Sequence, residues 1–252
     1  MIGIAAIPVL TRLYSPDDFG VLSVFSALIM ILAPIITLRY VLAIPLPRHN
    51  GIAFNLLVLS FGLMVFVCIF VSVLLCFFGA QLLAPFSMQV LAPFWWLITL
   101  GLLATSGYEI LTFWAMRRRD YRTIARTNIW QSFSGSLIKI ILGLLALKPL
   151  GLLIGGVAEK GGGISVLLRR FFIEFKDNWK HLRWSRVRKV AWRHRGFPIY
   201  RVPSQFMLIT ATQSPLLFIA WQYNAEITGQ FGLAMMALTL PLNLIGSSMG
   251  GR

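Results

Sequence analysis

Residues 50–108 contain no Asp, Glu, Lys or Arg, and this uncharged run restricts the possible folds more than any other feature. A soluble fold of this size cannot bury so long an apolar stretch, because its core is too small. A bilayer can, because its hydrocarbon layer is about 30 Å thick and accommodates about 20 apolar residues per helix. Only 12% of the chain is charged, whereas soluble domains carry about 25%. The sequence therefore predicts an integral membrane protein.

Apolar stretches separated by polar turns predict an all-α, polytopic transmembrane bundle of about eight helices. Ser15, Pro16 and two following aspartates are typical of a helix start. A turn is predicted at 79–81, and prolines at 34, 85 and 93 predict bends. The predicted helices cover residues 1–10, 19–44, 52–77, 82–114, 127–147, 150–168, 202–223 and 227–250.

The basic residues predict the orientation of these helices. Eleven of the 23 Lys and Arg lie between Arg169 and Arg201, and five more lie between Arg117 and Arg126. Both clusters follow even-numbered helices, so the positive-inside rule places the N-terminus in the cytoplasm. The charges of Glu159 and Lys160 oppose insertion of a helix at 150–168 into the bilayer. The positive-inside rule nevertheless requires this segment to span, because otherwise the loop with eleven basic residues would lie outside. The net charge of +15 is typical of nucleic-acid binding, but its placement between apolar runs indicates cytoplasmic loops, and we expect no nucleic-acid partner.

The segment 169–200 mixes aromatic side chains with cations. One interpretation is a helix lying on the inner leaflet and attracted to anionic lipid by about 1 kcal/mol per Lys or Arg. The other is a plain loop whose charges only set the topology. The composition leaves both open.

A segment near the N-terminus recurs near the C-terminus. In each copy a capping residue stands five positions before a glycine, Ser15 before Gly20 and Asn224 before Gly229, and an apolar helix with a proline follows. Six predicted helices separate the copies, so both have the same orientation, as in a parallel transporter repeat. Chance similarity between two capped apolar helices is the alternative.

The repeat predicts one lobe and the start of a second, pseudo-symmetric lobe. Residues 1–168 are expected to form an N-terminal transmembrane lobe whose first helix is truncated. Residues 169–200 are expected to form a basic, aromatic cytoplasmic loop. Residues 201–252 are expected to supply the first two helices of a truncated second lobe.

Several short motifs, in order along nearly the whole chain, resemble one family. They are Leu13-Tyr14-Ser15-Pro16-Asp17-Asp18-Phe19-Gly20; Thr37-Leu38-Arg39-Tyr40 with Ala43-Ile44-Pro45-Leu46-Pro47; Phe113-Trp114 with Arg117; Phe197-Pro198-Ile199-Tyr200 with Pro203-Ser204; and Gly229 with Pro241-Leu242 and Ile245-Gly246. The chain is similar to the polysaccharide transporter family, the O-antigen and capsule repeat-unit flippases of the multidrug/oligosaccharidyl-lipid/polysaccharide exporter superfamily. Val41 departs from the family pattern, which often has an acidic residue after Arg-Tyr.

This resemblance implies a bacterial inner-membrane protein that moves an undecaprenyl-pyrophosphate-linked oligosaccharide by alternating access, without a cofactor. It also implies that a polysaccharide polymerase and glycosyltransferases act as partners. A cavity lined by cations would offset the hydration lost by the anionic headgroup of the cargo.

Six polar side chains at or near membrane depth are candidates for such a cavity. Lys139 lies in mid-helix and either faces the cavity or extends to an interface, and the same choice applies to Arg39 near a helix end. Glu109 either pairs with Lys139 or faces the interface. Candidates at helix ends are Arg12, Arg201 and Gln213.

Three other functions are compatible with parts of the pattern. A cation-coupled multidrug exporter of the same superfamily needs buried carboxylates, and only Glu109 and Glu159 lie at membrane depth. A membrane-embedded glycosyl- or acyltransferase needs catalytic residues, but no acid–base pair or nucleophile triad is evident, so we expect no enzyme. A non-transporting scaffold for polymer synthesis is the third alternative.

The three histidines are isolated, so no metal site is expected.

Overall fold

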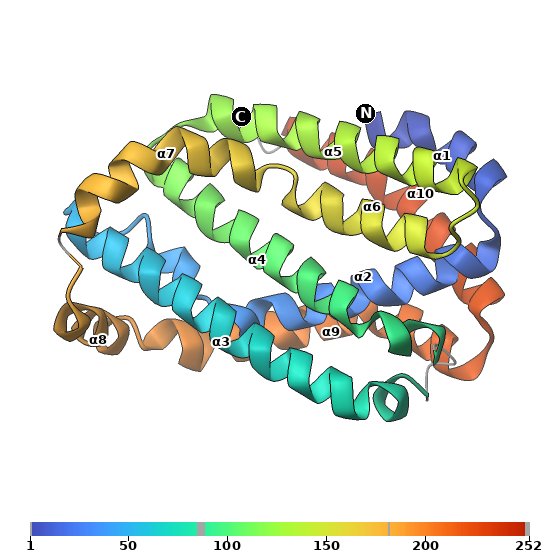
Figure 1. The fold of residues 1–252 in the computed structure, drawn as a ribbon, viewed down its shortest axis with the longest axis horizontal. Helices are drawn as coiled ribbons and strands as arrows, with labels where there is room; N and C mark the ends of the chain where they lie inside the picture. Colours follow the sequence, from blue (N-terminus) through green and yellow to red (C-terminus); the bar gives the residue numbers. More distant parts are fainter. Residues whose placement is uncertain (1, 85–88, 181, 250–252) are drawn as a thin grey trace.

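The computed structural model describes residues 2–84, 89–180 and 182–249, which form one elongated bundle of helices (Figure 1). No strand occurs in these ranges, so the predicted all-α bundle is confirmed. The helices are α1 (Ile2–Leu13), α2 (Pro16–Ile36), α3 (Asn50–Leu83), α4 (Trp95–Arg117), α5 (Tyr121–Leu144), α6 (Leu150–Gly161), α7 (Ile164–Trp179), α8 (Trp184–Arg193), α9 (Val202–Gln222) and α10 (Ala225–Met249), with short helical turns η1 (Tyr40–Ala43), η3 (Gln89–Phe94) and η4 (Phe197–Arg201).

Four stretches of the described chain are long and apolar enough to cross a membrane: α2, α3, α4, and α6 together with α7. The longest of them, α3, has 34 residues and presents a row of large apolar side chains on its outer side. A soluble protein rarely exposes so continuous an apolar surface. The row is Val65, Phe66, Ile69, Phe70, Val73, Phe77 and Phe78.

The start of α2 has the capping geometry that its sequence predicts. The Ser15 hydroxyl accepts a hydrogen bond from the Asp18 backbone N–H, and the Asp18 carboxylate accepts one from the Ser15 backbone N–H at 2.9 Å. Two otherwise unpaired backbone donors are thereby satisfied, and the acidic side chains lie at the positive end of the helix dipole.

The end of α2 comes earlier than the predicted residue 44. The helix stops at Ile36 because Leu38 and Arg39 adopt left-handed backbone conformations, with φ of 46° and 57°. A right-handed helix cannot continue through such residues. Pro34 lies within α2.

The third predicted helix also has wrong bounds. Residues 79–81 form no turn, and α3 continues through them to Leu83. Gly79 is buried within α3 together with Leu75 and Leu83, which share its helix face. The predicted helix at 82–114 is divided between the end of α3, η3 and α4, and residues 85–88 lie outside the described chain.

The predicted helix at 150–168 is broken beside its charged residues. Its first part, α6, ends at Gly161, and α7 begins at Ile164 and extends to Trp179, beyond the predicted end. Consecutive glycines weaken a helix because they lose the most backbone freedom on ordering. Together α6 and α7 still form one stretch long enough to span.

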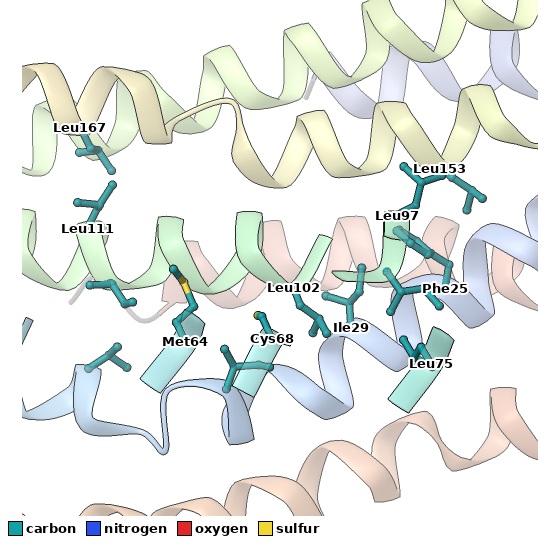
Figure 2. Close-up of a cluster of buried hydrophobic side chains, with 14 of the residues drawn as sticks. Phe25, Ile29, Met64, Cys68, Leu75, Leu97, Leu102, Leu111, Leu153 and Leu167 are labelled. Atoms are coloured by element: carbon teal, nitrogen blue, oxygen red, sulfur yellow. The ribbon is translucent and has the colours of Figure 1, made fainter. Parts of the chain in front are cut away.

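The core of the bundle lies between α2, α3, α4, α6 and α7 (Figure 2). Phe25 and Ile29 of α2 are fully buried, as is Leu102 of α4. Cys68 is buried on α3, whereas Cys76 is exposed, and both are free thiols.

One end of the bundle, here called the basic end, carries both clusters of cations. It comprises the junction of α4 and α5, the end of α7, and α8, at the left of Figure 1. An aromatic cluster closes the core at this end: Trp114 of α4 lies 5.5 Å from Phe175 of α7 and 6.3 Å from Phe54 of α3, measured between ring centroids.

The two copies of the sequence repeat pack against each other at the opposite end. Asn224 caps α10 by accepting a hydrogen bond from the Ile227 backbone N–H at 3.0 Å, as Ser15 caps α2. A Cβ added at Gly229 would overlap the Pro16 carbonyl oxygen, and one at Gly20 would overlap that of Ala225. The equivalent glycines therefore let the two helix starts meet backbone to backbone. The division into two lobes itself stays a prediction.

We expect Gly229→Ala to lower the free energy of unfolding by about 1–3 kcal/mol, because the added methyl overlaps the α2 backbone. Gly62→Ala is the matched control, because a Cβ there meets nothing within 4 Å and gains up to about 1 kcal/mol of helix propensity. Circular dichroism during unfolding in mixed detergent micelles measures both. Equal effects of the two substitutions would contradict the observed helix crossing.

Candidate functional site

A cavity of about 390 Å³, here called the central cavity, lies between helices from both ends of the chain. It is the described hollow that holds both Lys139 and Glu159. Polar and charged groups predominate on its α4, α5 and α6 sides. Its lining comprises Leu22 and Ser26 of α2, Thr105 and Tyr108 of α4, Gln131 and Lys139 of α5, Gly156, Glu159 and Lys160 of α6, and Met236 of α10.

An ion pair joins α5 to α6 across this cavity. The Lys139 Nζ lies 2.5 Å from the Glu159 Oε2, and the lysine side chain is 12% exposed against 45% for the glutamate. Small residues bring the helices close enough for this contact. A Cβ added at Gly155 would overlap the Lys139 stem, and one at Gly135 would lie 2.5 Å from the Glu159 Cβ.

The spacing of these residues is the same on both helices. Gly135 stands four positions before Lys139, and Gly155 stands four before Glu159, so each pair shares one helix face. The antiparallel helices thus place each charge against the glycine of the other. This register brings the Lys139 ammonium and the Glu159 carboxylate together as an ion pair.

Lys160 is the second cation of the central cavity. Within the part of the chain that the structure describes, its ammonium forms no ion pair or hydrogen bond, although its backbone carbonyl accepts a bond from the Gln131 side chain at 3.3 Å. Two lysines and one carboxylate leave the lining with an excess of one positive charge. The buried hydroxyl of Thr105, another lining residue, also finds no hydrogen-bond partner among the described residues. These groups suit an anionic, hydroxyl-rich ligand.

A second hollow of about 380 Å³ adjoins the central cavity between α2, α9 and α10. The two share Leu22, Ser26 and Met236 in their linings, so they are neighbours. Gln213 lines this part, and its amide nitrogen lies 2.9 Å from the Met30 sulfur. Of the sequence-predicted candidates, Lys139 therefore lines the central cavity and Gln213 lines the adjoining hollow.

Arg39 and Glu109 form a different ion pair, outside the cavity. The Arg39 Nη1 donates to the Glu109 Oε1 at 2.8 Å, with side-chain exposures of 14% and 23%. The hypothesis that Glu109 pairs with Lys139 is therefore wrong, because α5 packs its lysine against α6 instead. The family often has an acidic residue at the position of Val41, close to Arg39 in the chain. In this protein the carboxylate that pairs with Arg39 comes instead from Glu109 of α4.

Arg117 joins two of the family-like motifs at the basic end. Its guanidinium donates to the carbonyl oxygens of Pro45 and Pro47 and to the Asn50 side chain at 3.0 Å. The segment between η1 and α3 is therefore tied to the end of α4. This contact is structural, since it satisfies backbone carbonyls that no helix pairs.

The remaining candidates, Arg12 and Arg201, are exposed on α1 and at the end of η4. Neither lines the central cavity or the adjoining hollow between α2, α9 and α10. Among the described residues no group of three or more His, Cys, Asp or Glu could hold a metal ion.

Asp120 connects helices outside the membrane-spanning segments. It caps α5 by accepting a bond from the Thr123 backbone N–H at 3.2 Å, and it accepts another from Arg170 at 3.2 Å. The contacts with Thr123, followed by those with Arg170, lower the pKa of Asp120 from its usual value. The carboxylate therefore stays ionised and links α5 to α7.

A family model described as "polysaccharide biosynthesis protein" matches residues 9–250. The chain belongs to this family. The family resemblance inferred from the motifs is thereby confirmed. With its long apolar helices, this member of the polysaccharide biosynthesis family is a multi-pass membrane protein. Comparisons with curated proteins and with solved structures gave no match.

Sequence reasoning missed Glu159 and Lys160 as cavity residues in this polysaccharide biosynthesis protein. The signal was present, because Lys139 and Glu159 lie ten residues before and after Pro149, at the turn of a helical hairpin. Antiparallel helices place such positions at the same depth. The interpretation of Glu159 as an obstacle to membrane insertion hid its role as a partner.

A double-mutant cycle on Arg39→Met and Glu109→Gln should give a coupling energy of about 1–3 kcal/mol, because the pair is mostly buried. The control cycle uses Arg170→Met and Asp120→Asn, which keeps the cap of α5. Arg170 is 62% exposed, so that coupling should stay below about 1 kcal/mol. Unfolding in mixed micelles measures both cycles. A smaller coupling for Arg39 than for Arg170 would contradict the buried pairing.

Proposed function

We propose that this protein is a flippase that moves a lipid-linked oligosaccharide across the bacterial inner membrane for surface polysaccharide biosynthesis, such as O-antigen or capsule. Family membership supports a role in polysaccharide biosynthesis. The repeating unit of such a polymer is carried on undecaprenyl pyrophosphate, whose charged headgroup cannot cross hydrocarbon unaided. A polysaccharide polymerase and glycosyltransferases are the proposed partners that supply and consume this cargo.

The observation that carries the proposal is Lys160, whose ammonium forms no ion pair in the described part of the chain, beside the Lys139–Glu159 pair. An uncompensated cation at membrane depth is costly unless a ligand or water meets it. A pyrophosphate would supply the missing negative charge, and the hydroxyls of the sugars would bond to Thr105 and Gln131 on the same lining. The adjoining hollow, which Gln213 lines, offers additional room for the cargo.

We further propose that the basic end faces the cytoplasm, with the N-terminus on the same side. The clusters 117–126 and 169–195 both lie at this end, and the capped starts of α2 and α10 lie at the other. Retention of basic loops in the cytoplasm is the strongest determinant of orientation in multi-pass proteins.

The charge of the cavity favours this function over a cation-coupled multidrug exporter. A cationic drug requires a free carboxylate, and Glu159 is already paired with Lys139. We propose transport rather than catalysis, because the same pairing leaves that carboxylate no role as a general base. A scaffold without transport activity predicts no effect of cavity charges, and the following experiment separates it from a flippase.

Lys160→Ala should reduce surface glycan about tenfold and cause lipid-linked oligosaccharide to accumulate, because one charge-assisted bond to the headgroup is lost. Lys160→Arg should retain most export. Lys176→Ala is the matched control, because this lysine is exposed on α7 and away from the cavity. Glycan immunoblots of the native host, normalised to the protein in its membranes, provide the measurement.

Lys139→Ala should also reduce export, since it leaves Glu159 free to repel the anionic headgroup. The double variant Lys139→Ala/Glu159→Gln removes that repulsion and should recover part of the activity. Unchanged surface glycan in both Lys160→Ala and Lys139→Ala would exclude the cavity from transport and favour the scaffold.

A further inference from the structure

A large open pocket of about 980 Å³ lies beside α8, at the basic end and apart from the central cavity. Its position is fixed by Tyr40, which stands just after the end of α2 and donates a hydrogen bond to the Ala191 carbonyl at 3.1 Å. The pocket therefore lies where a membrane-spanning helix ends, at the boundary of the hydrocarbon. It is lined by Tyr40, Trp184, Ser185, Arg188, Lys189, Ala191, Trp192 and Arg195.

The two sides of α8 differ in chemistry. Val187 and Val190 are buried on the side that packs toward α3. The other side carries a stripe of Trp184, Arg188 and Trp192, whose spacing keeps all three on one helix face, and Arg195 follows it in the turn after α8. Because the apolar side is already packed against the bundle, this stripe is free to bind another molecule.

The aromatic members of the stripe are unusually exposed. Trp184 is 83% exposed and Trp192 is 70% exposed. The Arg195 guanidinium stacks over the Trp192 ring at 4.4 Å from its centroid, which holds the cation beside an apolar surface. Indole rings favour the headgroup level of a bilayer, where one edge meets water and the face meets lipid.

The three cations that line the pocket lie in a segment of the sequence that lacks acidic residues. The sequence contains no Asp or Glu between Asp177 and Glu226. Arg188, Lys189 and Arg195 form no ion pair with any residue in the described ranges. Three cations around one pocket form a site for an anion, and a phosphate matches it with bidentate geometry for arginine.

We propose that this pocket is a binding site for one anionic phospholipid, whose phosphate is held by Arg188, Lys189 and Arg195 and whose glycerol and upper acyl chains lie against Trp184 and Trp192. A lipid fits better than a free phosphate, because the site combines cations with exposed aromatic rings at the membrane boundary. The site thereby gives the basic segment 169–200 a specific ligand. It does not depend on the proposed transport, since it uses none of the central-cavity residues.

Native mass spectrometry of the purified protein, titrated with phosphatidylglycerol, tests this site. Phosphatidylcholine with the same acyl chains is the zwitterionic comparison and should bind much more weakly. Arg188→Ala/Arg195→Ala should raise the dissociation constant for phosphatidylglycerol about 30-fold, since each cation near the surface contributes about fivefold. Arg188→Lys/Arg195→Lys keeps the charge and should retain most of the affinity.

Lys176→Ala/Lys180→Ala is the matched control, because it removes the same net charge from exposed positions that do not line the pocket. It should leave phosphatidylglycerol binding within about twofold of wild type. An equal loss in both double variants would show a non-specific charge effect and overturn the site. Displacement of phosphatidylglycerol by millimolar inorganic phosphate would overturn the lipid assignment in favour of a free-phosphate site. If the alanine variant does not fold, Arg188→Gln/Arg195→Gln replaces it with the same expected outcome.

Discussion

In hydrocarbon a charged side chain has no water to solvate it, so it must pair with an opposite charge or face a polar space. The bundle meets this requirement in two places. Arg39 and Glu109 tie the turn after α2 to α4, while Lys139 and Glu159 join α5 to α6. Because each pair links different helices, charge neutralisation also determines which helices are neighbours. Among the described residues the Lys160 ammonium forms no ion pair or hydrogen bond, and it is found on the lining of a cavity.

Glycines make both the ion pair and the meeting of the two repeat copies possible. At Gly135 and Gly155 they admit the side chains of the facing helix, and at Gly20 and Gly229 they admit its backbone. Within a membrane such close approach replaces the hydrophobic effect as the source of helix association, because lipid tails are as apolar as the side chains. The charged cavity and the contact between the repeat copies therefore depend on the same structural device.

Helix starts could be predicted from the sequence better than helix ends. The capping residues Ser15 and Asn224 mark the starts of α2 and α10, because a cap is a local interaction. The end of α2 could not be found in this way. Residues 40–44 are apolar and continue the local pattern, whereas the turn is held by Arg39 and Tyr40 through contacts with distant helices. Local periodicity carries no information about such contacts.

The candidate site shows the same limit. Depth along a helix identified Lys139, which lines the central cavity, and Gln213, a candidate at a helix end, lines the adjoining hollow. One of the two interpretations of Glu109 placed the partner of Lys139 on the wrong helix, because the choice between Glu109 and Glu159 depends on whether the Lys139 side of α5 faces α4 or α6. The family motifs indicated the right family, which the match over residues 9–250 confirms.

The α5–α6 hairpin also affects how the chain is made. With 24 residues α5 is long enough to span, yet it is not among the stretches apolar enough to do so. Its lysine alone would cost about 2.5–3.5 kcal/mol at the centre of a bilayer on insertion scales. During synthesis α5 would therefore stay in the translocation machinery, without partitioning into the lipid, until α6 emerges from the ribosome. The two helices would then enter the lipid together, already neutralised.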